Sequence, residues 1–143
     1  MSEIRLMEEA DYHIGFMELI NTFTRSPKHI SYEEFCEAYA EIKKQNGVIF
    51  VAVKDNTLIG TIKLLVEKKL HNNLQSVGHI EDLTTHPEFR NMGTASQLIQ
   101  IATDYCKGMG CYKIVLACNK EYTDFYVKRG FLIKGTELSL YIS

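Results

Sequence analysis

The chain has 143 residues, of which 45% are hydrophobic and 24% are charged, and its formal net charge is −2. This composition argues against a disordered chain, and the charge argues against a surface that binds nucleic acid or membranes. The length favours one compact domain over residues 1–143, and no apolar run is long enough for a membrane span or a signal peptide, so we expect a cytoplasmic protein.

The first part of the chain predicts a short strand and two helices. The strand is expected at Ile4 to Met7. The first helix carries apolar residues at spacings of three and four, namely Phe16, Leu19, Ile20 and Phe23. The second helix is expected to begin after Ser31, because Ser31 and Glu34 form a capping box. Its buried stripe is predicted to be Phe35, Ala38, Tyr39 and Ile42.

The middle of the chain predicts a β-hairpin and a further strand. Residues 48–53 are rich in β-branched and aromatic side chains, residues 58–66 continue the strand pattern, and Asp55-Asn56 between them is typical of a turn. Another strand is expected from about Val77 to Thr85, and it ends at His86-Pro87 because a proline disfavours continuation.

The second half predicts helices and strands in alternation. A helix is expected from Thr94 to Lys107, followed by a strand at Tyr112 to Cys118, a short helix at Glu121 to Arg129, and one or two strands within Leu132 to Ile142. The buried face of the long helix is predicted to consist of Ala95, Leu98, Ile99, Ala102 and Cys106. This order predicts an α+β fold with helices on both faces of one mostly antiparallel sheet.

The segment from Arg90 to Ala95 joins a predicted strand to the long helix. A helix N-terminus leaves four backbone N–H groups without partners, and the small residues Gly93 and Ala95 allow an anion to approach them. Arg90 adds a positive charge. The segment is therefore either an anion-binding loop, suited to a pyrophosphate, or an ordinary loop that contains a glycine.

Two motifs resemble the GNAT acetyltransferase superfamily. Residues 90–95 fit its Q/R-x-x-G-x-G/A loop, and residues 124–131 look like its F-Y-x-x-x-G-F segment. The resemblance implies a GNAT fold with a six- or seven-stranded sheet, and a loop that binds the pyrophosphate of coenzyme A.

Within that superfamily, the chain most resembles the glucosamine-6-phosphate N-acetyltransferases. The resemblance is carried by Gly78-His79-Ile80-Glu81-Asp82 and by residues 110–116. It implies transfer of an acetyl group from acetyl-CoA to an amino sugar phosphate in UDP-N-acetylglucosamine synthesis, and a homodimer. No metal is expected, since the histidines show no ligand spacing and the four cysteines contain no Cys-x-x-Cys pair.

The resemblance also implies two sets of binding residues. Those that contact the cofactor would be Leu83, Thr84 and Thr85 on the strand, Arg90, Asn91, Met92, Gly93, Thr94 and Ala95 in the loop, and Tyr126, Val127 and Lys128. Those that contact the amino sugar would be Glu81, Asp82, Lys69, His71, Tyr112, Lys113 and either Thr24 or Thr22.

The reaction needs a base, an oxyanion donor and a partner for the leaving thiolate. An ammonium group has no free lone pair, so a base or a chain of waters must accept its proton, and Glu81 or Asp82 can hold that water, with Glu81 preferred. A backbone N–H of Leu83 or Thr84 can stabilise the developing oxyanion. Tyr126 is expected to stabilise the thiolate by a hydrogen bond, because full proton transfer from a group of pKa near 10 is uphill. The alternative for Tyr126 is a core aromatic residue beside Phe125.

Three positions depart from the glucosamine-6-phosphate enzymes. Ala117 stands where they usually have an acidic residue, Asn72 where they have a histidine, and Tyr141 near the place of an arginine that holds the sugar phosphate. All three positions belong to the part of the site that binds the acceptor amine, whereas the cofactor motifs are kept. Two alternatives therefore remain: a GNAT enzyme acting on another small amine or a protein N-terminus, and a non-catalytic acyl-CoA binding module.

Overall fold

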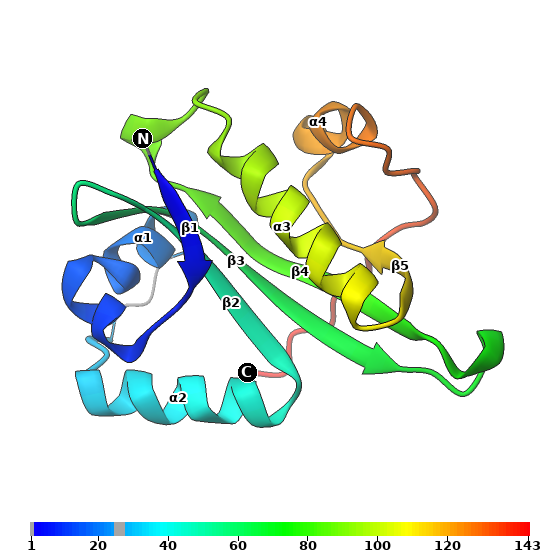
Figure 1. Cartoon of the computed structure of the whole chain (residues 1–143), viewed down its shortest axis with the longest axis horizontal. Helices are drawn as coiled ribbons and strands as arrows, with labels where there is room; N and C mark the ends of the chain where they lie inside the picture. The colour runs from blue at the N-terminus through cyan, green and yellow to red at the C-terminus, as the bar shows by residue number, and fades with distance from the viewer. Residues whose placement is uncertain (1, 25–27) are drawn as a thin grey trace.

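The computed structural model describes residues 2–24 and 28–143, and its centre is a five-stranded sheet (Figure 1). The strands lie in chain order, with three antiparallel pairs followed by a parallel β4–β5 pair. Their bounds are β1 Glu3–Leu6, β2 Gly47–Lys54, β3 Thr57–Lys68, β4 Ser76–Thr85 and β5 Cys111–Val115. The expected α+β, mostly antiparallel architecture is confirmed.

The described residues also form four α-helices and four short 3₁₀ helices, of which the last of each kind follows β5. The α-helices are α1 Phe16–Phe23, α2 Tyr32–Lys44, α3 Thr94–Gly108 and α4 Thr123–Val127. The 3₁₀ helices are η1 Glu9–Ile14, η2 Asn72–Leu74, η3 Pro87–Phe89 and η4 Lys120–Tyr122. None of the helices in the described part of the chain has both the length and the apolar character needed to cross a membrane.

Helix α3 covers one face of the sheet (Figure 1). Its apolar stripe packs on β3 and β4, and the predicted core residues Leu98, Ile99, Ala102 and Cys106 are all buried. A Cβ at Gly78 would lie 2.5 Å from the Cys106 sulfur. The close approach of α3 to β4 therefore requires a glycine at this position.

Helices α1 and α2 build a second core on the opposite face. Phe16, Leu19, Phe35 and Tyr39 are buried there against β2, β3 and Met7. The predicted capping box of α2 is confirmed, because Ser31 Oγ accepts from the Glu34 amide and Glu34 accepts from the Ser31 amide. Five predicted core residues are not fully buried: Ala38 is exposed on α2, Phe23 is 56% exposed at the end of α1, and Ile20, Ile42 and Ala95 are half-buried.

The C-terminal predictions need correction. Strand β5 ends at Val115 rather than Cys118, and no strand forms between Leu132 and Ile142 in the described residues. The sheet therefore has five strands rather than six or seven. The apolar pattern of the tail is typical of a strand, but Leu138 and Leu140 are 90% and 88% exposed, and no strand of the described residues pairs with the tail.

An ion pair anchors the start of the chain. Asp11 is 2% exposed, and Arg5 Nη1 and Nη2 each donate to its carboxylate at 2.8 Å. Burial alone would raise the pKa of Asp11, but the hydrogen bonds from Arg5 and from the Glu8 amide, with the charge of Arg5, outweigh it and lower that pKa overall. The pair joins β1 to η1 and stabilises the entry to α1.

We expect Arg5→Met to lower the free energy of unfolding by about 2 to 3 kcal/mol, since it leaves a buried carboxylate without its partner while Arg5 itself is partly exposed. Because the pKa of Asp11 is lowered in the folded state, its contribution is present above its ordinary pKa of about 4 and is lost as the pH falls. Urea titrations at several pH values should show that the difference in the free energy of unfolding between wild type and variant becomes smaller in acid.

Lys28→Met, which breaks the exposed pair with Glu34, is the control and should leave stability almost unchanged. If the difference in the free energy of unfolding between wild type and Arg5→Met stays constant from pH 7 to pH 3, the role assigned to Asp11 is wrong.

Candidate active site

Strand β4 bends where it parts from β5. Asp82 has a φ of 53°, a left-handed conformation that is rare for residues other than glycine, and the pairing with β3 shifts between Thr61 and Lys63. On its other edge, β4 pairs with β5 only as far as His79. Among the described residues, the edge of β4 at residues 80–85 therefore has no strand beside it, and its backbone groups are open to a ligand.

A cavity of about 1240 Å³ occupies this opening. Its walls are the second half of β4, the loop before α3 with the first turn of that helix, the segment after β5, and α4. Thr22 and Phe23, at the end of α1, contribute to its lining. The exposure of Phe23 is thus explained, because the residue lines a cavity rather than the core.

Helix α3 begins at the wall of this cavity without a side-chain cap. Gly93 occupies the N-cap position with a φ of 80°, and a Cβ there would meet no atom within 4 Å. The first amides of the helix are therefore accessible, and Arg90 lines the same cavity. The helix dipole, the amides and the guanidinium together favour an anion such as a pyrophosphate.

Tyr126 lies in the same cavity on α4. Its ring makes edge-to-face contacts with Phe125 and Phe131, at centroid distances of 5.1 and 5.7 Å. Burial, with the nearby thiol of Cys118, raises the pKa of the Tyr126 hydroxyl. At neutral pH the side chain is therefore a neutral O–H donor, held in place by its aromatic neighbours.

The two candidate bases differ in their surroundings. Lys63 Nζ lies 3.3 Å from a carboxylate oxygen of Asp82, so this side chain already has an ionic partner. The Glu81 carboxylate is exposed and, among the described residues, forms no hydrogen bond or ion pair. Glu81 is thus the carboxylate that remains available to a water or an amine.

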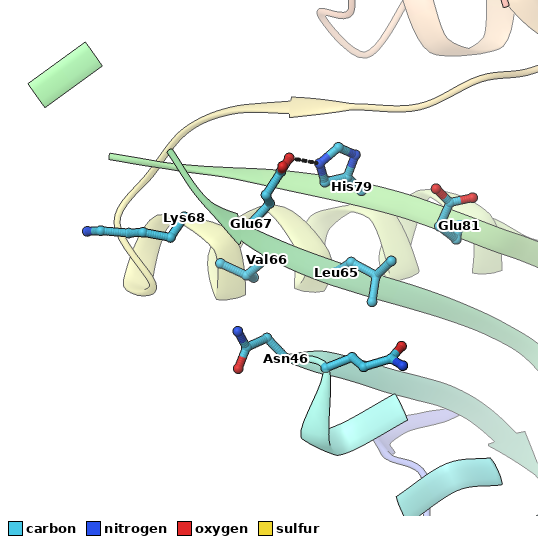
Figure 2. A pocket seen from close by; sticks show the side chains of 8 residues that line it. Asn46, Leu65, Val66, Glu67, Lys68, His79 and Glu81 are labelled. Atoms are coloured by element: carbon cyan, nitrogen blue, oxygen red, sulfur yellow. Dashed lines mark hydrogen bonds and ion pairs between the residues drawn. The ribbon is translucent and has the colours of Figure 1, made fainter. Parts of the chain in front are cut away.

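A second hollow, of about 390 Å³, lies on the face of the sheet opposite α3 (Figure 2). Figure 2 shows the Glu67 carboxylate turned toward the His79 ring, with Glu81 farther along β4. Glu67 is 2.9 Å from His79 Nε2 and 2.9 Å from Lys69 Nζ, and these contacts lower the pKa of Glu67. Glu81 lines both hollows.

Many of the predicted site residues meet in the large cavity. These are Glu81, Asp82, Leu83, Thr84, Thr85, Arg90, Asn91, Gly93, Thr94, Ala95 and Tyr126, with Thr22 rather than Thr24 from the first loop. The structure does not bring the others to its lining. They are Thr24, Met92, Val127 and Lys128, and the predicted substrate residues Lys69, His71, Tyr112 and Lys113.

Several lining residues were missed by the sequence analysis. The most informative are Ser96 and Arg129, which lie one position beyond the loop motif and one position before Gly130. Lys63, the partner of Asp82 outside the cavity lining, was missed because its place opposite Glu81 depends on the register of β3 and β4. The one available signal was the positive charge of Arg129 at the last variable position of the F-Y-x-x-x-G-F motif.

The model of the acetyltransferase (GNAT) family matches residues 13–131. The chain belongs to the GNAT family of acetyltransferases. GNAT acetyltransferases use acetyl-CoA, and this family match covers all of the cavity walls except the tail residue Glu137. The enzyme class that the two motifs indicated is therefore confirmed.

Similar proteins cover this GNAT chain almost completely. The glucosamine 6-phosphate N-acetyltransferase of Arabidopsis thaliana is 32% identical over 97% of this chain and 95% of its own length. The crystal structure of that enzyme superposes with a TM-score of 0.95, covering 100% of this chain and 99% of the other. An acetyltransferase structure from Trypanosoma brucei gives a TM-score of 0.94 at 26% identity, covering 99% of this chain and 100% of the other.

The residues of this GNAT chain fit coenzyme A. The uncapped amides of α3 and Arg90 suit its pyrophosphate, and the open edge of β4 offers donors and acceptors to the amide groups of its pantetheine arm. No cluster of three potential metal ligands is found in residues 2–24 and 28–143.

We expect Tyr126→Phe to lower kcat by about 10- to 100-fold, because it removes one hydrogen bond to a group that becomes charged, while the KM for acetyl-CoA changes little. Steady-state kinetics would measure both constants. Tyr105→Phe makes the same chemical change on α3, where the ring packs on Phe50, and should leave kcat unchanged. An unaltered kcat in Tyr126→Phe would remove this hydroxyl from the mechanism.

Proposed function

We propose that this chain is a glucosamine 6-phosphate N-acetyltransferase whose single domain supplies N-acetylglucosamine 6-phosphate for UDP-N-acetylglucosamine synthesis. The observation that supports it most is the near full-length similarity, at 32% and 31% identity, to the Arabidopsis and rice enzymes of that name. The kinked β4 with Glu81 and Asp82 agrees with this proposal, because it places two carboxylates at the wall of the cofactor cavity.

One side of the proposed site holds and orients acetyl-CoA. The α3 amides with Arg90 hold the pyrophosphate, and residues 83–85 of β4 hold the pantetheine arm by backbone hydrogen bonds. Acetyl-CoA supplies an acetyl group activated as a thioester. A backbone N–H of Leu83 or Thr84 donates to the thioester carbonyl oxygen, where negative charge develops. Tyr126 donates to the departing sulfur.

The acceptor side must remove a proton from the substrate ammonium. Glu81 is the proposed base, acting directly or through one water, because its carboxylate has no partner among the described residues. Asp82 is held by Lys63 and is proposed to bind the sugar. Attack by the amine then occurs directly on the thioester in a ternary complex, without an acetylated side chain.

A second candidate function is acetylation of another small amine. It is favoured by Ala117, which lines the cavity where the glucosamine-6-phosphate enzymes carry a carboxylate. A missing carboxylate weakens recognition of a sugar and leaves room for a different acceptor. The catalytic groups proposed above would serve either substrate.

Acetyl transfer is tested by the release of free thiol from acetyl-CoA. We expect glucosamine 6-phosphate to accelerate thiol release far above the rate without acceptor, and glucosamine to be a poorer acceptor because it lacks the phosphate. If glucosamine 6-phosphate has no effect but an aminoglycoside, a polyamine or a peptide N-terminus does, the second candidate is correct. Tight coenzyme A binding with no turnover on any amine would contradict both.

We also propose that the protein is a homodimer formed through its C-terminal tail. Leu138, Leu140 and Ile142 alternate along an extended segment and are 90%, 88% and 93% exposed. Strand β5 is at the edge of the sheet and pairs only with β4 among the described strands. An apolar, strand-like tail and an open sheet edge are complementary, so each tail can pair with the sheet of a second copy.

The double substitution Leu138→Asp and Leu140→Asp should convert the dimer to a monomer, because it places two charges in the proposed apolar interface. Sedimentation velocity would measure the mass. Folding should be preserved, since both side chains are exposed in the single chain. Ser139→Asp adds a charge on the opposite side of the tail and should disturb association less. A monomeric wild type at micromolar concentration would refute the proposal.

A further inference from the structure

Arg129 connects the helix that follows the loop at residues 90–95 to the second motif, residues 124–131. Its Nε donates to Ser96 Oγ at 3.0 Å, its Nη2 donates to the same oxygen, and its Nη1 donates to the Phe125 carbonyl at 2.7 Å. The guanidinium also lies over the Phe125 ring, 3.6 Å from its centroid. One side chain thus links the first turn of α3 to α4.

These contacts determine what the Ser96 hydroxyl can do. A hydroxyl has two acceptor lone pairs and one proton, and Arg129 supplies donors for both lone pairs. The Ser96 proton is therefore left to donate elsewhere. Ser96 is the third residue of α3 and lines the large cavity, so this donor lies beside the uncapped amides.

The same contacts fix the position of Tyr126. Arg129 holds the carbonyl and the ring of Phe125, the residue before Tyr126, on a helix of only five residues. A planar guanidinium that is both stacked and hydrogen-bonded keeps a defined orientation, which a lysine cannot reproduce. The distance between the phosphate-binding turn and the Tyr126 hydroxyl is consequently set through Arg129.

We propose that Arg129 is a positioning residue for the phosphates of coenzyme A, acting through Ser96. It orients the Ser96 O–H toward the anion, and its own charge adds to the positive potential at the N-terminus of α3. This inference depends on coenzyme A binding and is independent of the identity of the acceptor amine.

The first test compares Arg129→Met, Ser96→Ala and the double variant by calorimetric titration with coenzyme A. Each single variant should weaken binding by about tenfold, the effect of one charge-assisted hydrogen bond. Because the two residues act as one unit, the double variant should be hardly weaker than Arg129→Met. Losses that multiply to about 100-fold would show independent action and would overturn the proposal.

The second test separates phosphate recognition from a structural role in α4. Pantetheine lacks both the pyrophosphate and the nucleotide, and its weak binding can be followed by NMR titration. We expect the affinity for pantetheine to be the same in wild type, Ser96→Ala and Arg129→Met. An equal loss of affinity for pantetheine and coenzyme A would mean that Arg129 only maintains the fold, and would overturn the proposal.

Two further variants complete the design. Arg129→Lys keeps the charge but not the planar fork, so it should retain most of the defect in coenzyme A binding. Lys107→Met removes the same charge from the other end of α3 and should bind coenzyme A like wild type. A full rescue by lysine would show that charge alone matters and that Ser96 is not oriented by Arg129. If Arg129→Met fails to fold, Ser96→Ala still tests the proposal, because it should weaken the binding of coenzyme A but not that of pantetheine.

Discussion

The left-handed conformation of Asp82 is the constraint on which the rest of the site depends. A straight β4 would continue to pair with β5, and its backbone groups would be used within the sheet. The kink turns the second half of the strand away, so that one edge faces a cavity and the two carboxylates lie at its wall. A strained residue inside a strand is energetically unfavourable, and such strain is common where a strand serves a site rather than a sheet.

Attraction of an anionic cofactor has to be local, because the chain as a whole is slightly acidic. The structure supplies this attraction at one point, where the N-terminus of α3, Arg90 and Arg129 line the same cavity. The carboxylates of Glu81 and Asp82 lie along β4 at the wall of the same cavity, with Asp82 next to Lys63. The site therefore has a positive and a negative region, which suits a reaction between a phosphate-bearing donor and an amine.

The elements and motifs with local signals could be predicted from the sequence. Capping by Ser31 and Glu34, the Asp55-Asn56 turn and the glycine-containing loop at residues 90–95 each depend on neighbouring residues and were found where expected. The predictions that failed concerned features that depend on residues far away in the sequence. The tail has a strand pattern without a strand beside it, and the places of Lys63 and Arg129 follow from register and helix packing, which no local pattern encodes.

The exposed tail also affects how a newly synthesised chain associates. Until it is covered, the tail exposes a row of aliphatic side chains and β5 exposes an open sheet edge, and both surfaces promote aggregation. Covering it with a second copy would obey mass action, so apparent stability would rise with protein concentration. Dilution would then favour the monomer, with its tail uncovered, over the dimer.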